Sequence, residues 1–478
     1  MEKNTKLLLI DMFEKWAGEE ARSFVMLPPS GSYREYYRIT GRDRTAMGVY
    51  NADEKENAAF LQFSKHFKAK GLAVPDIYSE DSSNHVYLQE DLGDITLYGF
   101  LQGIRKGDDF PDELKAFYKK TLKSLIRFQV DGNNGLDYTY CYPRKAFDKQ
   151  SMLWDLHYFK YYFLKLARVP FDEQSLEDDY HQLIELLMEA EQDYFLYRDF
   201  QSRNVMVVDE EPYFIDYQGG RKGALQYDVA SLLFDAKADI PNEIRNELLD
   251  YYIDELNKIK PIDKDQFKKH YFGYVLIRIM QAMGAYGFRG FYEKKEHFLK
   301  SIPYAIENLK YLLSIIDFKD KMPTLFTALT NVTESEELIN ISQDKEVLTV
   351  RITSFSYKRG IPVDISGNGG GFVFDCRAIH NPGRYPEYAE KTGKDEEVIA
   401  FFGKEPEMSE FLTDVYSIVD KSVEKYIARG FKHLMVNFGC TGGQHRSVFS
   451  AEQLSAHLLN KYKVKVELKH VEQDMKRK

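Results

Sequence analysis

The chain has little cysteine and no long apolar run, and each shortage excludes a class of protein. Its 478 residues include three cysteines, Cys141, Cys376 and Cys440, which are too few and too scattered for a disulfide framework or a zinc site. The N-terminal stretch MEKNTKLLLIDMFEKW contains a four-residue apolar block that ends at Asp11. A block this short is neither a signal peptide nor a membrane span. We therefore expect a soluble, cytoplasmic protein with no membrane partner.

Positive charge is also scarce. The chain has 65 Lys and Arg against 75 Asp and Glu, for a net charge of -10. Non-specific binding along a nucleic-acid backbone depends on Lys and Arg displacing counterions, so this balance disfavours it. From Glu346 onward, however, 20 Lys and Arg face 18 Asp and Glu. Any contact with nucleic acid is therefore expected at the C-terminal end.

Apolar and aromatic side chains are plentiful. Hydrophobic residues make up 44% of the chain, with 34 Tyr and 33 Phe. A chain of this length and composition is too long for one ordinary domain and too apolar to be disordered. We therefore expect two or more packed domains.

The first part of the chain predicts an α+β domain over residues 1–320. Up to about residue 95, short β-rich runs alternate with turns and flank one amphipathic helix at Glu54–Lys70, which predicts a small sheet with a helix. From residue 96 to 320, helical periodicity dominates. The run VMVVDEEPYFIDY interrupts it and predicts a β-hairpin, because two apolar segments flank a polar turn.

The last part of the chain predicts a separate α/β domain. Residues 321–346 are polar and lose a clear period, which favours a linker. Over residues 347–478, strand-like runs such as VLTVRITSFSY and HLMVNFG alternate with amphipathic helices. This alternation is typical of a mainly parallel sheet.

The stretch FLYRDFQSRN, followed by FID, places Asp199, Asn204 and Asp216 around the predicted hairpin. In phosphoryl transfer, one carboxylate orients the acceptor hydroxyl, while an amide and a second carboxylate hold the magnesium ion. Two groups at adjacent hairpin ends can converge on one cation. The alternative is that all three are ordinary turn residues, since Asp and Asn favour turns.

These residues carry a resemblance to a known family. YRDFQSRN, FIDYQ, Tyr227–Leu233 (YDVASLL) and Val86–Asp94 (VYLQEDLGD) resemble the aminoglycoside phosphotransferase-like kinases, and most closely the branch that phosphorylates the anomeric hydroxyl of N-acetyl amino sugars. The resemblance covers about residues 5–320. It implies a bilobal protein-kinase-like fold, ATP and Mg²⁺ as cofactors, and a small-molecule sugar as substrate.

The same resemblance implies roles for single residues. Asp199 is the catalytic base, and Asn204 and Asp216 are the magnesium ligands. The strand VYLQED offers backbone groups to adenine near Glu90. Asp228, at the start of a helix, caps that helix and braces the catalytic loop.

The sequence departs from the family at the phosphate-binding lysine. The strand TAMGVYN has none, although kinases commonly carry a lysine there. The turn PPSGSYREYYR contains Ser32 and Arg34, which can hold phosphates instead. A solvated loop and a kinase-like domain that binds nucleotide without catalysis are the alternatives.

A second motif, GCTGGQHRS, lies between a predicted strand and a predicted helix near the C-terminus. Such a turn gathers backbone N–H groups and a positive helix end around one point, which suits an anion. It lacks the ending of a Walker loop. The spacing from Cys440 to Arg446 also fits a cysteine phosphatase, in which a thiolate and an arginine face one phosphate.

This motif also carries a resemblance. Together with Ser354–Pro362, Phe374–Pro382 and Lys391–Asp395, it is similar to the C-terminal domain of the RapZ/YvcJ family, over residues 347–474. The resemblance implies two partners, a phosphosugar effector and a small regulatory RNA. It implies an anion pocket formed by Lys358, Arg377, Asn381, Gly442, Gly443, Gln444, His445 and Arg446.

Two functions from different classes follow. The first is an ATP- and magnesium-dependent kinase of an N-acetyl amino sugar, as in cell-wall recycling, fused to a phosphosugar- or RNA-binding regulatory domain. The second is a non-catalytic RNA-binding adapter whose kinase-like domain senses nucleotide. The basic tail KYKVKVELK predicts an edge strand, with RNA contact as its alternative. Either function is compatible with an oligomer.

Overall fold

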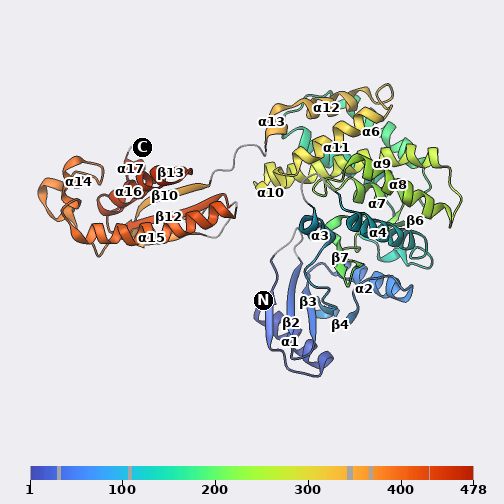
Figure 1. Ribbon diagram of the computed structural model, residues 1–478, viewed down its shortest axis with the longest axis horizontal. Helices are drawn as coiled ribbons and strands as arrows, with labels where there is room; N and C mark the ends of the chain where they lie inside the picture. The colour runs from blue at the N-terminus through green and yellow to red at the C-terminus, as the bar shows by residue number, and fades with distance from the viewer. Residues whose placement is uncertain are drawn as a thin grey trace. The chain divides into compact units, whose positions relative to one another are not determined.

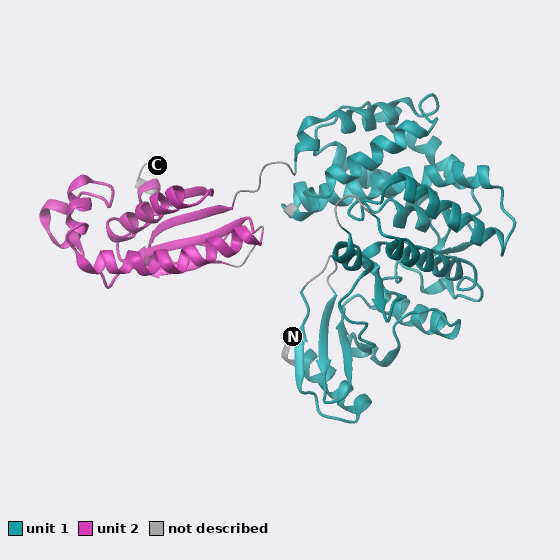
Figure 2. Cartoon of the chain, viewed as in Figure 1, with its two compact units in different colours: residues 1–342 teal, residues 343–478 magenta. Residues whose placement is uncertain are grey.

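The computed structural model describes residues 2–28, 34–105, 110–341, 348–364, 370–429 and 431–476 (Figure 1). The chain divides into two compact units, residues 1–342 and 343–478, which Figure 2 shows in different colours. Each unit has its own core, so each is described by itself.

The first unit begins with a five-stranded antiparallel sheet in the order β1-β2-β3-β5-β4. Successive side chains of a strand point to opposite faces, and both faces are apolar here. On one face α1 packs Leu9 and Phe13 against Ile39; on the other, α2 packs Phe60 against Val49. The elements are α1 (Glu2–Ala17), β1 (Ser23–Met26), β2 (Glu35–Thr40), β3 (Thr45–Tyr50), α2 (Glu54–Ala69), β4 (Ile77–Asp81) and β5 (Val86–Gln89).

The rest of the first unit is helical, as predicted. Its helices are α3 (Leu97–Ile104), α4 (Asp112–Val130), α5 (Lys149–Phe159), α6 (Glu173–Met188), α7 (Leu225–Leu233), α8 (Asn242–Asn257), α9 (Lys264–Tyr286), α10 (Glu296–Leu299), α11 (Ile302–Ile315), α12 (Pro323–Glu334) and α13 (Glu336–Asn340). Within the described part of the chain, none of the helices combines the length and apolarity of a membrane span.

Four short strands lie among these helices: β6 (Tyr194–Leu196), β7 (Val205–Val208), β8 (Glu211–Phe214) and β9 (Arg221–Gly223). Strands β7 and β8 pair antiparallel, with Val205 opposite Phe214, which confirms the predicted hairpin. Strand β6 pairs antiparallel with β9. The segments on either side of the hairpin are thereby brought next to each other.

The predicted linker at residues 321–346 is wrong over most of its length. Helix α12 packs against α6 and α11, and its side chains Leu329 and Val332 are buried in the core of the first unit. Asp179 of α6 accepts a hydrogen bond of 2.7 Å from the backbone nitrogen of Leu325. The Thr, Asn and Glu residues that make this segment polar lie among apolar residues spaced one helical turn apart.

The second unit is an α/β domain with a four-stranded parallel sheet in the order β11-β12-β10-β13, as predicted. Strand β13 lies at the edge of the sheet, which also agrees with the sequence analysis. The elements are β10 (Thr349–Ser356), β11 (Phe372–Asp375), α14 (Glu396–Phe402), α15 (Pro406–Ala428), β12 (His433–Cys440), α16 (Arg446–Lys461), β13 (Lys465–His470) and α17 (Val471–Lys476).

If α12 belongs to the core of the first unit, truncating its buried face will destabilise that unit. Leu329→Ala should lower the free energy of unfolding by about 2–5 kcal/mol, because it leaves a cavity in a packed core. Thr327→Ala, on the exposed side of the same helix, should change it by less than about 0.5 kcal/mol. Denaturant unfolding of both variants checks this. If the two variants unfold at the same denaturant concentration, α12 does not belong to the core and residues 321–346 are a linker.

Candidate active site and C-terminal loop

The loop after β6 is held by a carboxylate from another element. The backbone nitrogens of Tyr197 and Arg198 donate to the two oxygens of Asp228, at 2.8 and 3.0 Å. Asp228 is fully buried in α7, and burial raises its pKa to about 7. The Tyr197 hydroxyl donates to the carbonyl of Ile215 (2.6 Å), which fastens the loop to the segment after β8.

Asp228 braces the loop, as predicted, but it does not cap its helix. Helix α7 begins at Leu225 with Ala224 at the cap position, and the cap makes no side-chain hydrogen bond. Asp228 is therefore one turn inside the helix, and its carboxylate accepts two hydrogen bonds from the loop and one of 3.5 Å from Gln129 of α4.

Arg198 adopts a left-handed backbone conformation, with φ of 82°. Such a conformation costs a non-glycine residue on the order of 1–3 kcal/mol, so the surroundings must enforce it. The guanidinium of Arg198 binds both oxygens of Asp155 in α5, at 2.7 and 2.8 Å, and donates to the hydroxyl of Tyr227 (2.6 Å). These bonds fix the position of the next residue, Asp199.

The three residues predicted to act together do converge. The side-chain nitrogen of Asn204 donates to the backbone carbonyl of Asp199 (2.8 Å) and to Oδ2 of Asp216 (3.1 Å). A Cβ placed on Gly219 would lie 3.6 Å from Oδ2 of Asp199, so the turn after Asp216 passes beside Asp199. The catalytic loop and the end of the hairpin thus share one small volume.

The charge balance of this cluster suits a cation. Burial raises the pKa of Asp216, and the nearby charge of Asp199 raises it further, whereas the hydrogen bond from Gln218 (2.6 Å) opposes both effects. Asn204 uses its nitrogen for both of its bonds, so its oxygen is the atom available to a metal. Hard oxygen donors of this kind are those that Mg²⁺ prefers.

Asn204 and Asp216 would supply only two protein ligands to a metal ion. Among the described residues, no group of three or more His, Cys, Asp or Glu side chains is placed to hold a metal by itself. Mg²⁺ commonly takes one or two carboxylates and completes its shell with phosphate and water. The residues present therefore fit a magnesium ion that binds together with a nucleotide.

Arg34 reaches this cluster from the small sheet. It precedes β2, is only 4% exposed, and pairs with Glu56 of α2 at 3.2 Å. Glu56 also accepts a bond of 3.3 Å from Gln218, the residue that donates to Asp216. A chain of polar contacts thus runs from the sheet to the hairpin. Spacing in the sequence did not single out Glu56 or Gln218, although Glu56 lies in the predicted helix after β3 and Gln218 lies two residues after Asp216.

The other two residues predicted to contact the nucleotide are Glu90 and Ser32. Glu90 directly follows β5, where its backbone nitrogen donates to the carbonyl of Asp76 (2.8 Å) and its carboxylate accepts from the nitrogen of Asp76 (3.1 Å). The nitrogen of Glu90 is therefore already used within the protein. Ser32 lies outside the described residues.

In the second unit, the GCTGG loop joins the end of β12 to α16. Strands β10 and β12 are parallel, so Ser356 lies opposite Cys440 and the loop starts where both strands end. Gly443 has φ of 66°, and a Cβ there would lie 2.4 Å from Cγ of Glu472. A Cβ on Gly442 would meet nothing within 4 Å. A side chain would therefore be excluded at Gly443 but not at Gly442.

The side chains that follow the glycines face inward. His445 and Arg446 are 8% and 6% exposed. Nε2 of His445 donates to the carbonyl of Tyr388 (2.9 Å), and Gln444 donates to the carbonyls of Ala389 and Lys391. These bonds tie the loop to the segment before α14.

The cysteine phosphatase alternative does not fit this geometry. Cys440 is 3% exposed, and its sulfur accepts from the backbone nitrogen of Gly443 (3.1 Å) and contacts the hydroxyl of Ser447 (3.2 Å). Arg446 donates to the carbonyls of Arg377 and Ile379, at 2.8 and 2.9 Å. The thiol is closed off, and the arginine is engaged with the backbone.

The other residues predicted for the anion pocket lie around the loop, and each is either exposed to solvent or already bound to another group of the protein. Lys358 is exposed on the turn after β10. Arg377 makes a paired contact with Asp375. Asn381 accepts from the nitrogen of Gly383 (3.2 Å), and Gly383 lies against the ring of His445. The structure therefore places all eight residues at one end of the sheet.

Comparisons with known proteins agree with this division. The family model "Phosphotransferase enzyme family" matches residues 27–262, and the model "RapZ C-terminal domain" matches residues 348–474. A nucleotide-binding protein of Fervidobacterium nodosum is 41% identical over 131 residues, 27% of this chain and 45% of that protein. One from Psychrobacter sp. is 35% identical over 182 residues, 36% of this chain and 54% of that protein. The chain thus spans about half the length of the curated relatives it matches.

Solved kinase structures are more distant. Choline kinase of Cryptosporidium parvum aligns with 68% of this chain and 100% of its own, at 11% identity and a TM-score of 0.46. A thermostable mutant of aminoglycoside phosphotransferase APH(4)-Ia aligns with 63% of this chain and 98% of its own, at 13% identity and a TM-score of 0.40.

Both resemblances noted in the sequence are confirmed by the family models, one in each unit. Residues 27–262 match the phosphotransferase enzyme family, and residues 348–474 match the RapZ C-terminal domain, on the same chain.

Proposed function

We propose that the chain is an ATP- and Mg²⁺-dependent cytoplasmic kinase that phosphorylates a hydroxyl of a sugar, with an N-acetyl amino sugar as the acceptor. The observation that carries the proposal is the convergence of Asp199, Asn204 and Asp216, next to the ion pair of the buried Arg34 with Glu56. A phosphotransferase needs few groups beyond these, because its catalysis consists mostly of positioning and charge stabilisation.

Asp199 orients the acceptor hydroxyl and takes its proton. Its backbone is fixed on one side by Arg198, which Asp155 holds, and on the other by Asn204. Asn204 and Asp216 are the residues that would hold the metal. Bound Mg²⁺ supplies neutralisation of the charge on the transferred phosphoryl group.

Arg34 takes the part of the missing strand lysine. In protein kinases a lysine on the third strand is held by a glutamate of the following helix. Here β3 has no lysine, but Glu56 of α2 holds Arg34 instead. An arginine is always charged and binds phosphate oxygens through a planar fork, so it suits this position.

The resemblance to the amino-sugar branch is what supports a sugar as the acceptor. A small cavity of ≈ 20 Å³ beside the loop, lined by Gln201, Asp235, Arg278 and Asn308 among others, has room for about one water molecule and not for a sugar.

Replacing the proposed base tests the reaction. Asp199→Asn should lower kcat for phosphate transfer to N-acetylglucosamine by about 10²–10⁴-fold, because the proton of the acceptor hydroxyl loses its base. Nucleotide binding should persist. Sugar-dependent ATP consumption across a panel of free sugars is the measurement. If the variant still turns over at the normal rate, Asp199 is not the catalytic base.

The ion pair at the nucleotide side is tested by a double-mutant cycle. Arg34→Met and Glu56→Gln should each raise the KM for ATP by about tenfold or more. The double variant should be little worse than either single one, because both changes break the same contact. Lys65→Met, which breaks an exposed pair with Glu80, is the control and should leave KM unchanged. Additive effects of Arg34→Met and Glu56→Gln would contradict a shared role.

For the C-terminal unit, the proposed ligand is a small phosphosugar at the GCTGG loop. His445 and Arg446 are buried and already donate to the backbone carbonyls of the segments beside the loop, so a small anion there would be held mainly by backbone N–H groups of the loop. The exposed Lys358 is the group that a larger partner would meet. A regulatory RNA is therefore the second ligand to test, with a gel-shift assay of Arg446→Ala and Lys358→Ala.

The two glycines of the loop provide a matched pair of variants. Gly443→Ala should abolish binding of glucosamine 6-phosphate, because its Cβ collides with Glu472 and its left-handed backbone is strained. Gly442→Ala should bind normally, since its Cβ meets open space. Calorimetric titration of the full chain measures both. Equal binding by the two variants would move the ligand away from this loop.

A further inference from the structure

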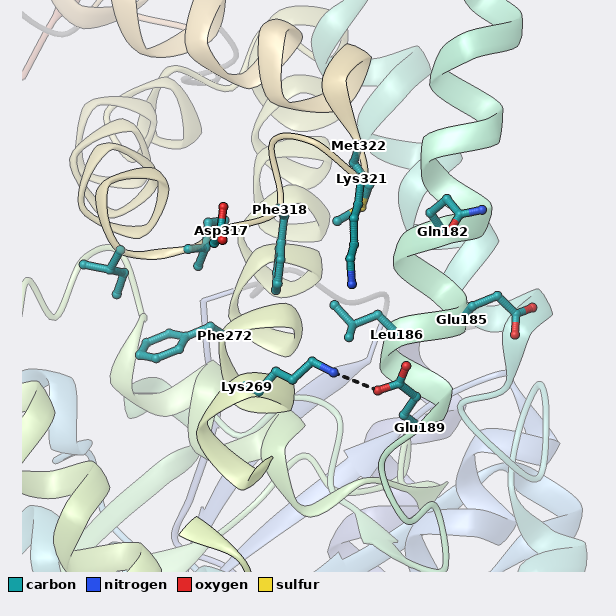
Figure 3. A pocket seen from close by; sticks show the side chains of 12 residues that line it. Gln182, Glu185, Leu186, Glu189, Lys269, Phe272, Asp317, Phe318, Lys321 and Met322 are labelled. Atoms are coloured by element: carbon teal, nitrogen blue, oxygen red, sulfur yellow. Dashed lines mark hydrogen bonds and ion pairs between the residues drawn. The ribbon is translucent and has the colours of Figure 1, made fainter. Parts of the chain in front are cut away.

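The first unit contains a second cavity, of ≈ 370 Å³, between α6, α9 and the segment that connects α11 to α12 (Figure 3). The residues that line it are Gln182, Glu185, Leu186, Glu189, Lys269, Phe272, Ile315, Ile316, Asp317, Phe318, Lys321 and Met322. None of them belongs to the catalytic loop, the hairpin or the small sheet. Its size is at the lower end of the range for small-molecule sites.

The walls of this cavity are mainly apolar. Leu186 comes from α6, Phe272 from α9, and Phe318 and Met322 from the connecting segment. Leu186, Phe318 and Met322 are 8%, 9% and 2% exposed, so the packed core of the unit holds them in place. Three separate elements thus present apolar surface to one space, which favours a ligand with an apolar body.

Most of the charges at the cavity are already paired. Glu189 accepts from Lys269 (3.1 Å) and from His270 (3.3 Å), and Glu185 pairs with Lys149. Figure 3 shows the carboxylate of Glu185 directed away from the space between the aromatic rings.

Lys321 differs from these groups. Figure 3 shows its side chain running beside Phe318, with the ammonium pointing into the cavity, whereas the carboxylate of Asp317 points away. Within the described ranges, no carboxylate forms an ion pair with Lys321. The cavity therefore presents one unneutralised cation at the edge of an apolar space.

We propose that this cavity is a binding site for a small amphipathic carboxylate, separate from the catalytic site. The carboxylate pairs with Lys321, and an aromatic or branched apolar body lies between Phe272 and Phe318. A neutral ligand of the same shape gains the apolar contacts but not the ion pair. The charge of Lys321 therefore selects the acid over its amide.

A ligand in this cavity would contact segments of the unit that lie far apart in the sequence. Lys321 and Phe318 precede α12, whereas Leu186 and Phe272 belong to α6 and α9. A ligand that contacts all of them stabilises the packing of α12 on the rest of the unit, because it binds only when these elements are together. Helix α9 continues from Phe272 to Arg278, which donates to Ser231 of α7 (2.9 Å).

The test is calorimetric titration of the full chain with 4-phenylbutyrate and with its neutral counterpart, 4-phenylbutyramide. The acid should bind more tightly than the amide. Lys321→Gln should weaken binding of the acid by about tenfold or more, and leave binding of the amide unchanged. Lys319→Gln changes an exposed lysine of the same segment that does not line the cavity, and should bind both compounds normally.

Three outcomes would overturn the proposal: no binding of the acid, equal affinity for acid and amide, or equal effects of Lys321→Gln and Lys319→Gln. Phe272→Ala should weaken the binding of both compounds, and its unfolding curve shows whether the variant is folded. Asp199→Asn should bind 4-phenylbutyrate as the unmodified chain does. Loss of binding in that variant would assign the ligand to the catalytic site instead.

Discussion

The active site depends on one buried carboxylate. Asp228 accepts the backbone N–H groups of Tyr197 and Arg198, and this contact sets the course of the chain just before Asp199. Burying a carboxylate is unfavourable, as its pKa of about 7 indicates, so the structure retains it against a cost. What the contact provides is geometry: Arg198 stays in its left-handed conformation, and Asp199 is directed toward the hairpin.

The sequence predicted the parts of this site that depend on local spacing. The spacing of five positions from Asp199 to Asn204 and the hairpin that follows were enough to place three groups together, because a hairpin returns the chain to its starting point. Contacts between distant segments were missed. Glu56 meets Arg34 across the two strands β2 and β3, and Gln218 reaches Glu56 from the other lobe. No periodicity carries that information.

The direction of side chains also could not be predicted from the sequence. The motif GCTGGQHRS correctly indicated a strand, a glycine loop and a helix, but not that Arg446 turns to the backbone of Arg377 and Ile379. The same holds at residues 321–346, where polar composition concealed the apolar face of α12. Composition reports what a segment contains, whereas packing depends on which of its faces meets the core.

The proposed replacement of the strand lysine by Arg34 has a consequence for how this protein is detected. Nucleotide probes that acylate the conserved amine of kinases need a nucleophilic nitrogen beside the phosphates. Strand β3 presents none, and a guanidinium remains protonated and unreactive. Proteome surveys that rely on such labels would pass over this chain even when its nucleotide site is occupied.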